Sequence, residues 1–286
     1  MDAGPPTAAG AGRTGPFAGR ELALRVVSGL VLAVLVVAAL VAGGWAFALV
    51  WLAAGILGAA EWITISRTEP RLPLVAVIAA ALVGAVLCLR TGQPAWAAPA
   101  VLAAGAVALL ALVRDGRERL RALGALGGGA VVALVPPALR DAPGIGIAGP
   151  AWMFAVVWTT DVAAYFTGRT LGGPKLMPSV SPKKTWSGAL GGLLAATLAG
   201  TAVVAYGRAG AADLAGIPLI AAGLASAAAS ALSQAGDLAE SGLKRVHGVK
   251  DSGRIIPGHG GVMDRLDGFF AVALLAGLYL ILRPAA

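Results

Sequence analysis

Two polar stretches interrupt an otherwise apolar chain, and both carry residue types suited to phosphate chemistry. The denser stretch, 236–267, alternates carboxylates with cations around a glycine-rich turn. Carboxylate oxygens are ligands that Mg²⁺ prefers beside substrate phosphates. Lysine and arginine neutralise phosphate charge, and glycine lets backbone N–H groups approach an anion closely. The stretch therefore indicates phosphoryl-type transfer, in which catalysis is mostly positioning and charge stabilisation.

The acidic candidates fall where two predicted helices end and begin. Asp237 lies at the end of the first, and Asp264 and Asp267 lie at the start of the second. If those ends are adjacent, the carboxylates converge at the membrane surface, and the start of the second helix adds a positive dipole end. The further candidates in this stretch are Asp251, the cations Lys244, Arg245, Lys250 and Arg265, and the turn residues His259, Gly260 and Gly261.

The second polar stretch, 168–186, follows a predicted span that contains Asp161. An ionisable side chain inside a membrane helix is costly and is by default a functional candidate. A structural pairing of Asp161 with a buried arginine explains it equally well. Ser181, Lys183 and Lys184 place hydroxyl and ammonium donors just before the next helix, where they suit a lipid phosphate or a nucleotide triphosphate.

The composition predicts a membrane protein. The 286 residues are 58% hydrophobic and 13% charged, whereas a soluble domain carries about 25% charged residues. The net charge of +8 would suggest a nucleic-acid partner in a soluble protein, but here the placement of the charges decides, and no nucleic acid is expected. The single cysteine, Cys88, excludes a disulfide within the chain and a cysteine-rich metal site.

The predicted fold class is all-α, a polytopic integral membrane protein with about nine transmembrane helices. Each span needs about 20 apolar residues, and backbone groups in lipid must be satisfied within the helix. The expected spans are 22–42, 45–64, 72–90, 95–113, 120–139, 148–167, 187–206, 214–235 and 267–283.

Lysine and arginine predict the orientation. With the N-terminus in the cytoplasm, 18 of the 22 basic residues lie inside, and only Arg90, Arg140, Arg208 and Arg283 lie outside. The expected location is the inner cell membrane, with a cytoplasmic active site. Residues 1–20 are interpreted as a flexible cytoplasmic tail, 21–140 as a transmembrane scaffold, and 141–286 as the catalytic region with polar segments 168–186 and 236–266.

Other charged residues have simpler interpretations. The arginines from Arg114 to Arg121 follow the positive-inside bias or contact anionic lipid. Glu61 lies next to Trp62, and this pair is interpreted as an interfacial anchor rather than as part of a catalytic site.

The motifs of the C-terminal half resemble the phosphatidate cytidylyltransferase (CDP-diacylglycerol synthase) family. The matching positions are Ser241, Leu243, Lys244-Arg245, Lys250-Asp251, Gly253, Pro257, His259-Gly260-Gly261, Asp264-Arg265 and Asp267. The elements Gly-Asp-Leu-x-Glu-Ser, Ser-Pro-Lys-Lys-Thr-Trp and Asp-x-x-Ala-Tyr-x-x-Gly-Arg also match, so the motifs cover about 151–268. One departure is Ser187, where family members often carry glutamate.

The resemblance implies a reaction between CTP and phosphatidate. A phosphate oxygen of phosphatidate attacks the α-phosphate of CTP, giving CDP-diacylglycerol and pyrophosphate. On this interpretation Asp237 and Asp264 bind Mg²⁺, and Asp251 and Asp267 support that ion or hold a second one. The residues that hold phosphate groups or stabilise charge are then Lys244, Arg245, Lys250, Arg265, Ser181, Lys183 and Lys184. The resemblance also implies a homodimer surrounded by membrane lipids.

Two alternatives stay open at this point. A CTP-dependent polyprenol kinase would phosphorylate an alcohol and release CDP. A transporter would place its polar groups near the middle of the membrane at broken helices. The polar groups of this chain lie near one membrane face instead, which favours an enzyme.

Overall fold

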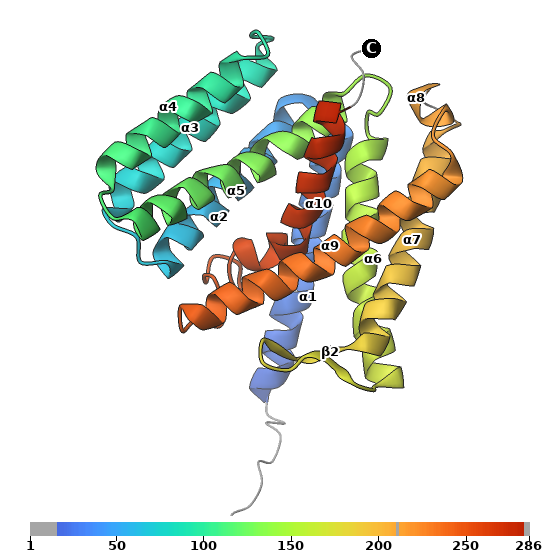
Figure 1. Cartoon of the computed structure of the whole chain (residues 1–286). Coiled ribbons are helices and arrows are strands. Elements are labelled where there is room, and N and C mark those ends of the chain that lie inside the picture. Colours follow the sequence, from blue (N-terminus) through green and yellow to red (C-terminus); the bar gives the residue numbers. More distant parts are fainter. Residues whose placement is uncertain (1–15, 210–211, 283–286) are drawn as a thin grey trace, which may run out of the picture.

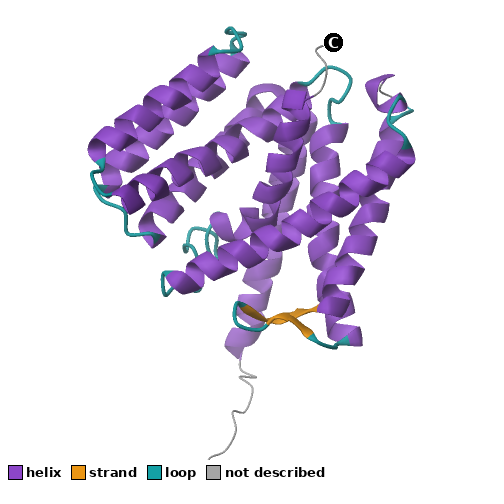
Figure 2. Ribbon diagram, in the orientation of Figure 1, coloured by secondary structure: helices purple, strands orange, loops and turns teal. Residues whose placement is uncertain are grey.

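The computed structural model describes residues 16–209 and 212–282, and Figures 1 and 2 show a helical protein with one small hairpin. The helices are α1 (Pro16–Ala42), α2 (Gly44–Ile65), α3 (Arg71–Arg90), α4 (Ala97–Leu112), α5 (Gly116–Asp141), α6 (Ala148–Leu171), α7 (Trp186–Gly207), α8 (Ala212–Ala215), α9 (Leu219–Val246) and α10 (Met263–Leu282). The predicted tail lies outside the described residues up to position 15, as does Arg283, and α1 begins at Pro16.

Several helices are long and apolar enough to cross a membrane. Within the described residues six meet both criteria, namely α2, α3, α5, α7, α9 and α10. Two further apolar stretches, Val26–Ala42 and Ala97–Leu112, are shorter. The chain is therefore a multi-pass helical membrane protein, and every predicted span overlaps one helix, although nine crossings are not established by length and composition.

The all-α prediction misses a β-hairpin in the first polar stretch. Strands β1 (Lys175–Met177) and β2 (Ser181–Thr185) pair antiparallel, with Lys175 opposite Thr185. Gly172 and Gly173 adopt φ angles of 63° and 100°, which a residue with a side chain rarely adopts, so the chain turns sharply after α6. The short hairpin then presents its polar side chains between the end of α6 and the start of α7.

Helix α9 extends beyond the end of the predicted eighth span. Helix α9 continues to Val246, so the polar stretch after 235 begins as helix rather than as a loop. Its polar residues recur with helical spacing, and the Glu240–Lys244 pair, four residues apart, is the orientation that supports a helix. As a result Asp237, Glu240 and Lys244 project from a rigid element.

The helices form two layers that share one hydrophobic core, to which α2 contributes Phe47 and Trp51 and α5 contributes Val132 and Leu139. Figure 1 shows α1, α6, α7 and α10 upright beside one another, α9 crossing them obliquely, and α2–α5 inclined as a separate layer. Trp51 of α2 stacks on Phe269 of α10 with ring centroids 4.7 Å apart. The ring of Phe154 of α6 also stacks on Trp51, with the two ring centroids 6.0 Å apart. The N-terminal half is therefore packed directly against the helices that carry the predicted catalytic residues.

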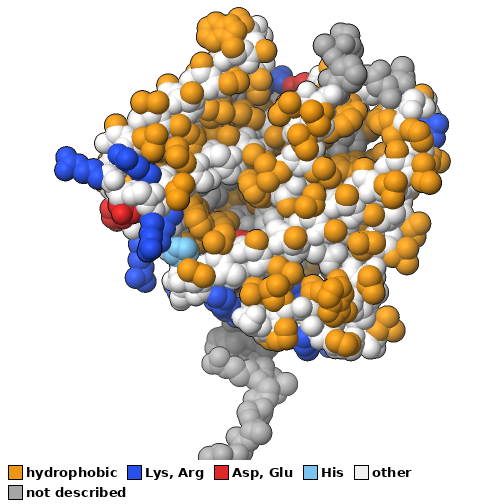
Figure 3. Space-filling model, in the orientation of Figure 1, with side chains coloured by type: hydrophobic (Ala, Val, Ile, Leu, Met, Phe, Trp, Pro, Cys, Tyr) orange, Lys and Arg blue, Asp and Glu red, His pale blue; other side chains and the backbone are white. Residues whose placement is uncertain are grey.

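The polar segments gather at one end of the molecule. The hairpin, the start of α1 and the end of α9 all lie at the lower end in Figure 1. In Figure 3 basic side chains line the lower and left edges, whereas apolar side chains cover most of the rest of this face. The tertiary fold thus brings together the two polar stretches that the sequence singled out.

Candidate active site

Lys184 of the hairpin forms an ion pair with Asp237 of α9. Ser241, one helical turn further along α9, donates a hydrogen bond to Asp237 Oδ1 at 3.3 Å. The preceding residue on the strand, Lys183, is exposed, because successive side chains of a strand point to opposite sides. The pair fixes the hairpin against α9 and places one ammonium group next to a predicted metal ligand.

Helices α9 and α10 cross almost backbone to backbone. A Cβ on Gly236 would lie 2.7 Å from the Asp267 carbonyl oxygen, and a Cβ on Gly268 would lie 2.3 Å from Ser233 Oγ. Glycine at both positions allows this approach. The crossing brings Asp237, the residue after Gly236, into electrostatic interaction with Asp267, so two predicted metal ligands from distant parts of the sequence meet.

Asp161 of α6 belongs to the same cluster. It interacts electrostatically with Asp267 and Asp237, and with the cations Lys184 and Arg265. Among the described residues no ion pair joins Asp161 to a buried arginine, and Arg265 is itself exposed. The expected structural pairing with a buried arginine is therefore not seen among the described residues, and a functional role of Asp161 stays a prediction.

Both carboxylate oxygens of Asp264 already accept hydrogen bonds from the protein. Its Oδ1 accepts a hydrogen bond from Lys244 Nζ at 2.7 Å. Ser252 N–H donates to both carboxylate oxygens at 3.1 and 2.9 Å, and Gly261 N–H donates to Oδ2 at 2.9 Å. An ion bound directly to Asp264 would have to displace one of these donors. The predicted backbone donor at Gly261 thus binds a protein carboxylate here.

Two carboxyl groups face each other beside Lys244. Glu240, only 6% exposed, lies 3.3 Å from Lys244 Nζ and interacts electrostatically with Asp267. Neither Glu240 oxygen meets a hydrogen-bond donor among the described residues, by the usual distance and angle criteria. Two adjacent acceptors can coexist in a buried site only when a proton or a cation lies between them.

The cluster contains more carboxyl groups than cations. Its five carboxylates are Asp161, Asp237, Glu240, Asp264 and Asp267, and its cations are Lys184, Lys244 and Arg265. Within the described chain no three acidic, histidine or cysteine side chains stand close enough to enclose a metal by themselves. Mg²⁺ needs only one or two carboxylates when substrate phosphates complete its shell, so the residues present fit such an ion.

The remaining predicted residues surround this cluster at the molecular surface. His259 Nδ1 lies 2.7 Å from Ser28 Oγ of α1, and the Gly260 carbonyl accepts a hydrogen bond from Ile256 N–H at 2.9 Å. Ser181 is half-buried at the start of β2. The exposed residues of the set are Lys183, Arg245, Lys250, Asp251 and Arg265. They form the rim that faces out from the cluster.

Glu61 is part of this site, and the anchor interpretation missed it. It is 5% exposed and accepts hydrogen bonds from Val262 N–H at 2.9 Å, Met263 N–H at 2.8 Å and Ser252 Oγ at 3.1 Å. The sequence did contain a signal, because an ionisable residue in an apolar span is a functional candidate by default.

Ser187, the departure from the family pattern, has a local structural partner. Its hydroxyl hydrogen-bonds to the Gly172 carbonyl and lies 3.0 Å from Thr185 Oγ1, while Thr185 accepts from Gly188 N–H at 3.1 Å and caps α7. Ser187 therefore fastens the base of the hairpin to the end of α6.

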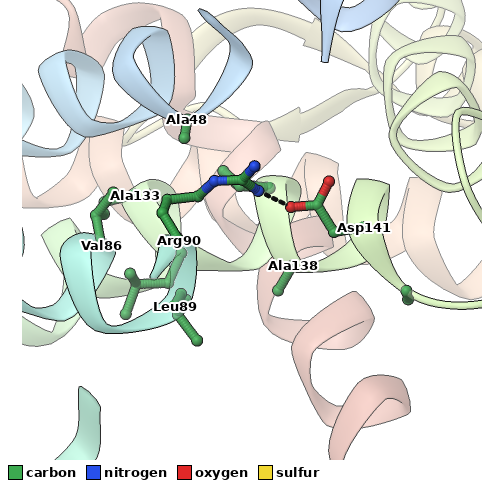
Figure 4. Close-up of a pocket in the computed structure, with 10 residues that line it drawn as sticks. Ala48, Val86, Leu89, Arg90, Ala133, Ala138 and Asp141 are labelled. Atoms are coloured by element: carbon green, nitrogen blue, oxygen red, sulfur yellow. Dashed lines mark hydrogen bonds and ion pairs between the residues drawn. The ribbon is translucent and has the colours of Figure 1, made fainter. Parts of the chain in front are cut away.

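Two cavities differ sharply in what surrounds them. One, of about 360 Å³, lies between α2, α5, α9 and α10 and is apolar except for Glu240 and Asp267 at its border. The other, of about 150 Å³, lies at the C-terminal ends of α3 and α5. Figure 4 shows that its polar feature is a lone ion pair of Arg90 with Asp141. Only the larger cavity adjoins the carboxylate cluster.

Comparison with known proteins finds relatives that share one name. A phosphatidate cytidylyltransferase of Brucella suis is 49% identical over 141 residues, which is 49% of this chain and 50% of that protein. One from Staphylococcus epidermidis is 45% identical over 128 residues, covering 45% of this chain and 47% of that protein. The chain thus spans about half the length of the curated relatives it matches.

The family comparison extends much further along the sequence. The sequence model described as the cytidylyltransferase family matches residues 23–282, which include both polar stretches and all the helices that carry the charge cluster. The chain belongs to the cytidylyltransferase family.

Proposed function

We propose that this protein transfers a cytidylyl group from CTP to phosphatidate, producing CDP-diacylglycerol and pyrophosphate for phospholipid biosynthesis. The observation that carries the proposal is the convergence of carboxylates and lysines from α6, the hairpin, α9 and α10 at one end of a membrane-embedded bundle. The relatives' name, phosphatidate cytidylyltransferase, supports the choice of substrates.

In the proposed reaction an oxygen of the lipid phosphate forms a bond to the α-phosphorus of CTP. The bond from that phosphorus to the bridging oxygen breaks, and pyrophosphate leaves with the electron pair. No general base is required, because the attacking phosphate is already ionised at neutral pH. The work left to the protein is to bring two anions together and to neutralise their charge.

Asp237 and Asp267, with Glu240 beside them, would hold Mg²⁺, and Asp251 remains a predicted supporting ligand. When bound, the ion would neutralise charge on the phosphate groups. Asp264 has a different role in this proposal, since its bond to Lys244 directs that ammonium group towards the cluster. Lys184 is similarly directed by Asp237. The exposed rim cations, Lys183, Arg245, Lys250 and Arg265, would attract and orient the triphosphate.

The larger apolar cavity supports a lipid substrate. It borders Glu240 and Asp267, so an acyl chain inside it would leave the attached phosphate close to the carboxylate cluster. We propose this cavity as the binding site for one acyl chain of phosphatidate.

We also propose a nine-span topology in the inner membrane, with the N-terminus and the active site in the cytoplasm. The positive-inside distribution supports it, since the hairpin and the end of α9 carry basic clusters. The homodimer stays a prediction.

The function is tested by incubating purified protein with labelled CTP, phosphatidate and Mg²⁺. The expected result is CDP-diacylglycerol and pyrophosphate in equal amounts, lost on chelation of the metal. Release of CDP with a polyprenol acceptor would indicate the kinase alternative, and solute uptake in vesicles without a lipid product would indicate transport.

The two hairpin lysines provide a matched pair for testing the site. Lys184→Met leaves Asp237 without its ion-pair partner and should lower kcat/KM by about 100-fold, a loss typical of a removed charge-stabilising donor. Lys183→Met removes the same charge from the neighbouring exposed position and should have a much smaller effect. Steady-state kinetics would contradict the site if the two variants were equally impaired.

The acyl-chain site is tested with two glycines of α5 that both face open space. A side chain at Gly124 would enter the larger cavity, whereas Gly127 does not line it. Gly124→Leu should shift the preference towards phosphatidates with shorter acyl chains, because the cavity is shortened, and Gly127→Leu should not. Chain-length profiles that stay identical in wild type and Gly124→Leu would rule out this cavity.

The topology is tested in a Cys88→Ala background with cysteines placed at Gly92 and Gly248, both in turns outside the helices. A membrane-impermeant maleimide added to intact spheroplasts should label Gly92→Cys and leave Gly248→Cys unlabelled until the membrane is opened. The reverse pattern would overturn the orientation.

A further inference from the structure

We infer that Glu61, in the predicted scaffold half of the chain, is a positioning residue that sets the 251–263 loop and, through it, the Asp264–Lys244 pair. The catalytic consequence of this inference rests on the proposed function. The physical part, that Glu61 holds the loop, does not.

Glu61 has the donors that a buried carboxylate needs, and all of them come from the loop and the start of α10. Removing a carboxylate from water is costly unless hydrogen bonds or cations replace the lost solvent. Three donors converge on Glu61, from Ser252 Oγ, Val262 N–H and Met263 N–H. Because no cation takes part in these contacts, the carboxylate is stabilised by the loop's fixed dipoles and in turn fixes the loop.

Two of these donors are orphan N–H groups at the start of α10. The first N–H groups of a helix have no partner within the helix, and a negative charge there interacts favourably with the helix dipole. Glu61 supplies both effects from a different helix. The anion at the start of α10, which the sequence led us to expect from a substrate phosphate, is therefore a protein side chain.

The loop backbone wraps closely around this carboxylate. A Cβ on Gly253 would lie 2.5 Å from Glu61 Oε1, and a Cβ on Gly261 would lie 2.5 Å from Oε2. Two glycines on opposite arms of the loop thus provide a space of carboxylate size. An interfacial anchor would need no such enclosure.

Ser252 transmits the position of Glu61 to Asp264. Its hydroxyl donates to Glu61 Oε2, while its backbone N–H donates to both oxygens of Asp264. Asp264 N–H returns a longer hydrogen bond of 3.3 Å to Ser252 Oγ. Since Asp264 holds Lys244 at 2.7 Å, a displacement at Glu61 passes through three hydrogen-bonded steps to a proposed phosphate-binding ammonium group.

A second contact fastens the same loop to the N-terminal half. Ser28 of α1 donates to the Pro257 carbonyl at 2.9 Å and lies 2.7 Å from His259 Nδ1. The loop is therefore held from α1 at its tip and from α2 at its base. Glu61 is the more buried of the two contacts and the one connected to Asp264.

The test compares Glu61→Gln with Glu69→Gln, which makes the same change at an exposed glutamate of the N-terminal half that accepts a hydrogen bond from Arg71 N–H. Hydrogen–deuterium exchange on the full-length protein in lipid nanodiscs should show faster exchange at 252 and 261–264 in Glu61→Gln only. Turnover of CTP with phosphatidate should fall by about 10- to 100-fold, the loss expected from a small misplacement of catalytic groups. Ser252→Ala and the double variant complete a cycle, in which the double variant should be no worse than Glu61→Gln.

Unchanged exchange in the loop of Glu61→Gln would overturn the inference, as would faster exchange with normal turnover or strictly additive losses in the cycle. If Glu61→Gln does not fold, the Ser252→Ala variant carries the same test, because it removes only the connecting hydroxyl. A wild-type protein without turnover would refute the proposed function, whereas the exchange measurement would still decide whether Glu61 holds the loop.

Discussion

Helices α9 and α10 approach so closely at Gly236 and Gly268 that acidic groups from two distant stretches are forced together. Asp237, Glu240 and Asp267 lie around this crossing and interact electrostatically, and neither oxygen of Glu240 has a hydrogen-bond donor among the described residues. Such an arrangement is unfavourable unless positive charge is supplied. The hairpin supplies positive charge through Lys184, and the start of α10 positions Lys244 through Asp264.

The division of the chain into scaffold and catalytic region is less sharp than the sequence indicated. Trp51 of α2 lies in the aromatic core with Phe269, and Glu61 of the same helix binds the loop that carries Asp264. One inclined helix thus serves both packing and site geometry. The N-terminal half contributes rigidity where the C-terminal half has a loop rich in glycine.

Helix positions were predictable from the sequence because an apolar run of span length has few alternatives in lipid. The clustering of Asp237, Asp264 and Lys244 at one end was predictable from span parity. The hydrogen-bond partners of these residues were not predictable. Asp264 binds Lys244 in an orientation that depends on how Ser252 and Gly261 direct their N–H groups. The hairpin was not predicted, because a few residues of β-structure between membrane helices give almost no periodic signal. The contacts of Glu61 with the loop were not predicted, because its partners lie about 190 residues away in the sequence.

The central claim is that the crossing of α9 and α10 binds a divalent cation through Asp267 and its neighbours. Electron paramagnetic resonance of Mn²⁺ added to the purified protein with CTP measures this directly. We predict bound Mn²⁺ in the wild type and in the variant Glu69→Gln, which removes an exposed carboxylate far from the crossing, and its loss in Asp267→Asn. Equal Mn²⁺ binding in wild type and Asp267→Asn would contradict the account.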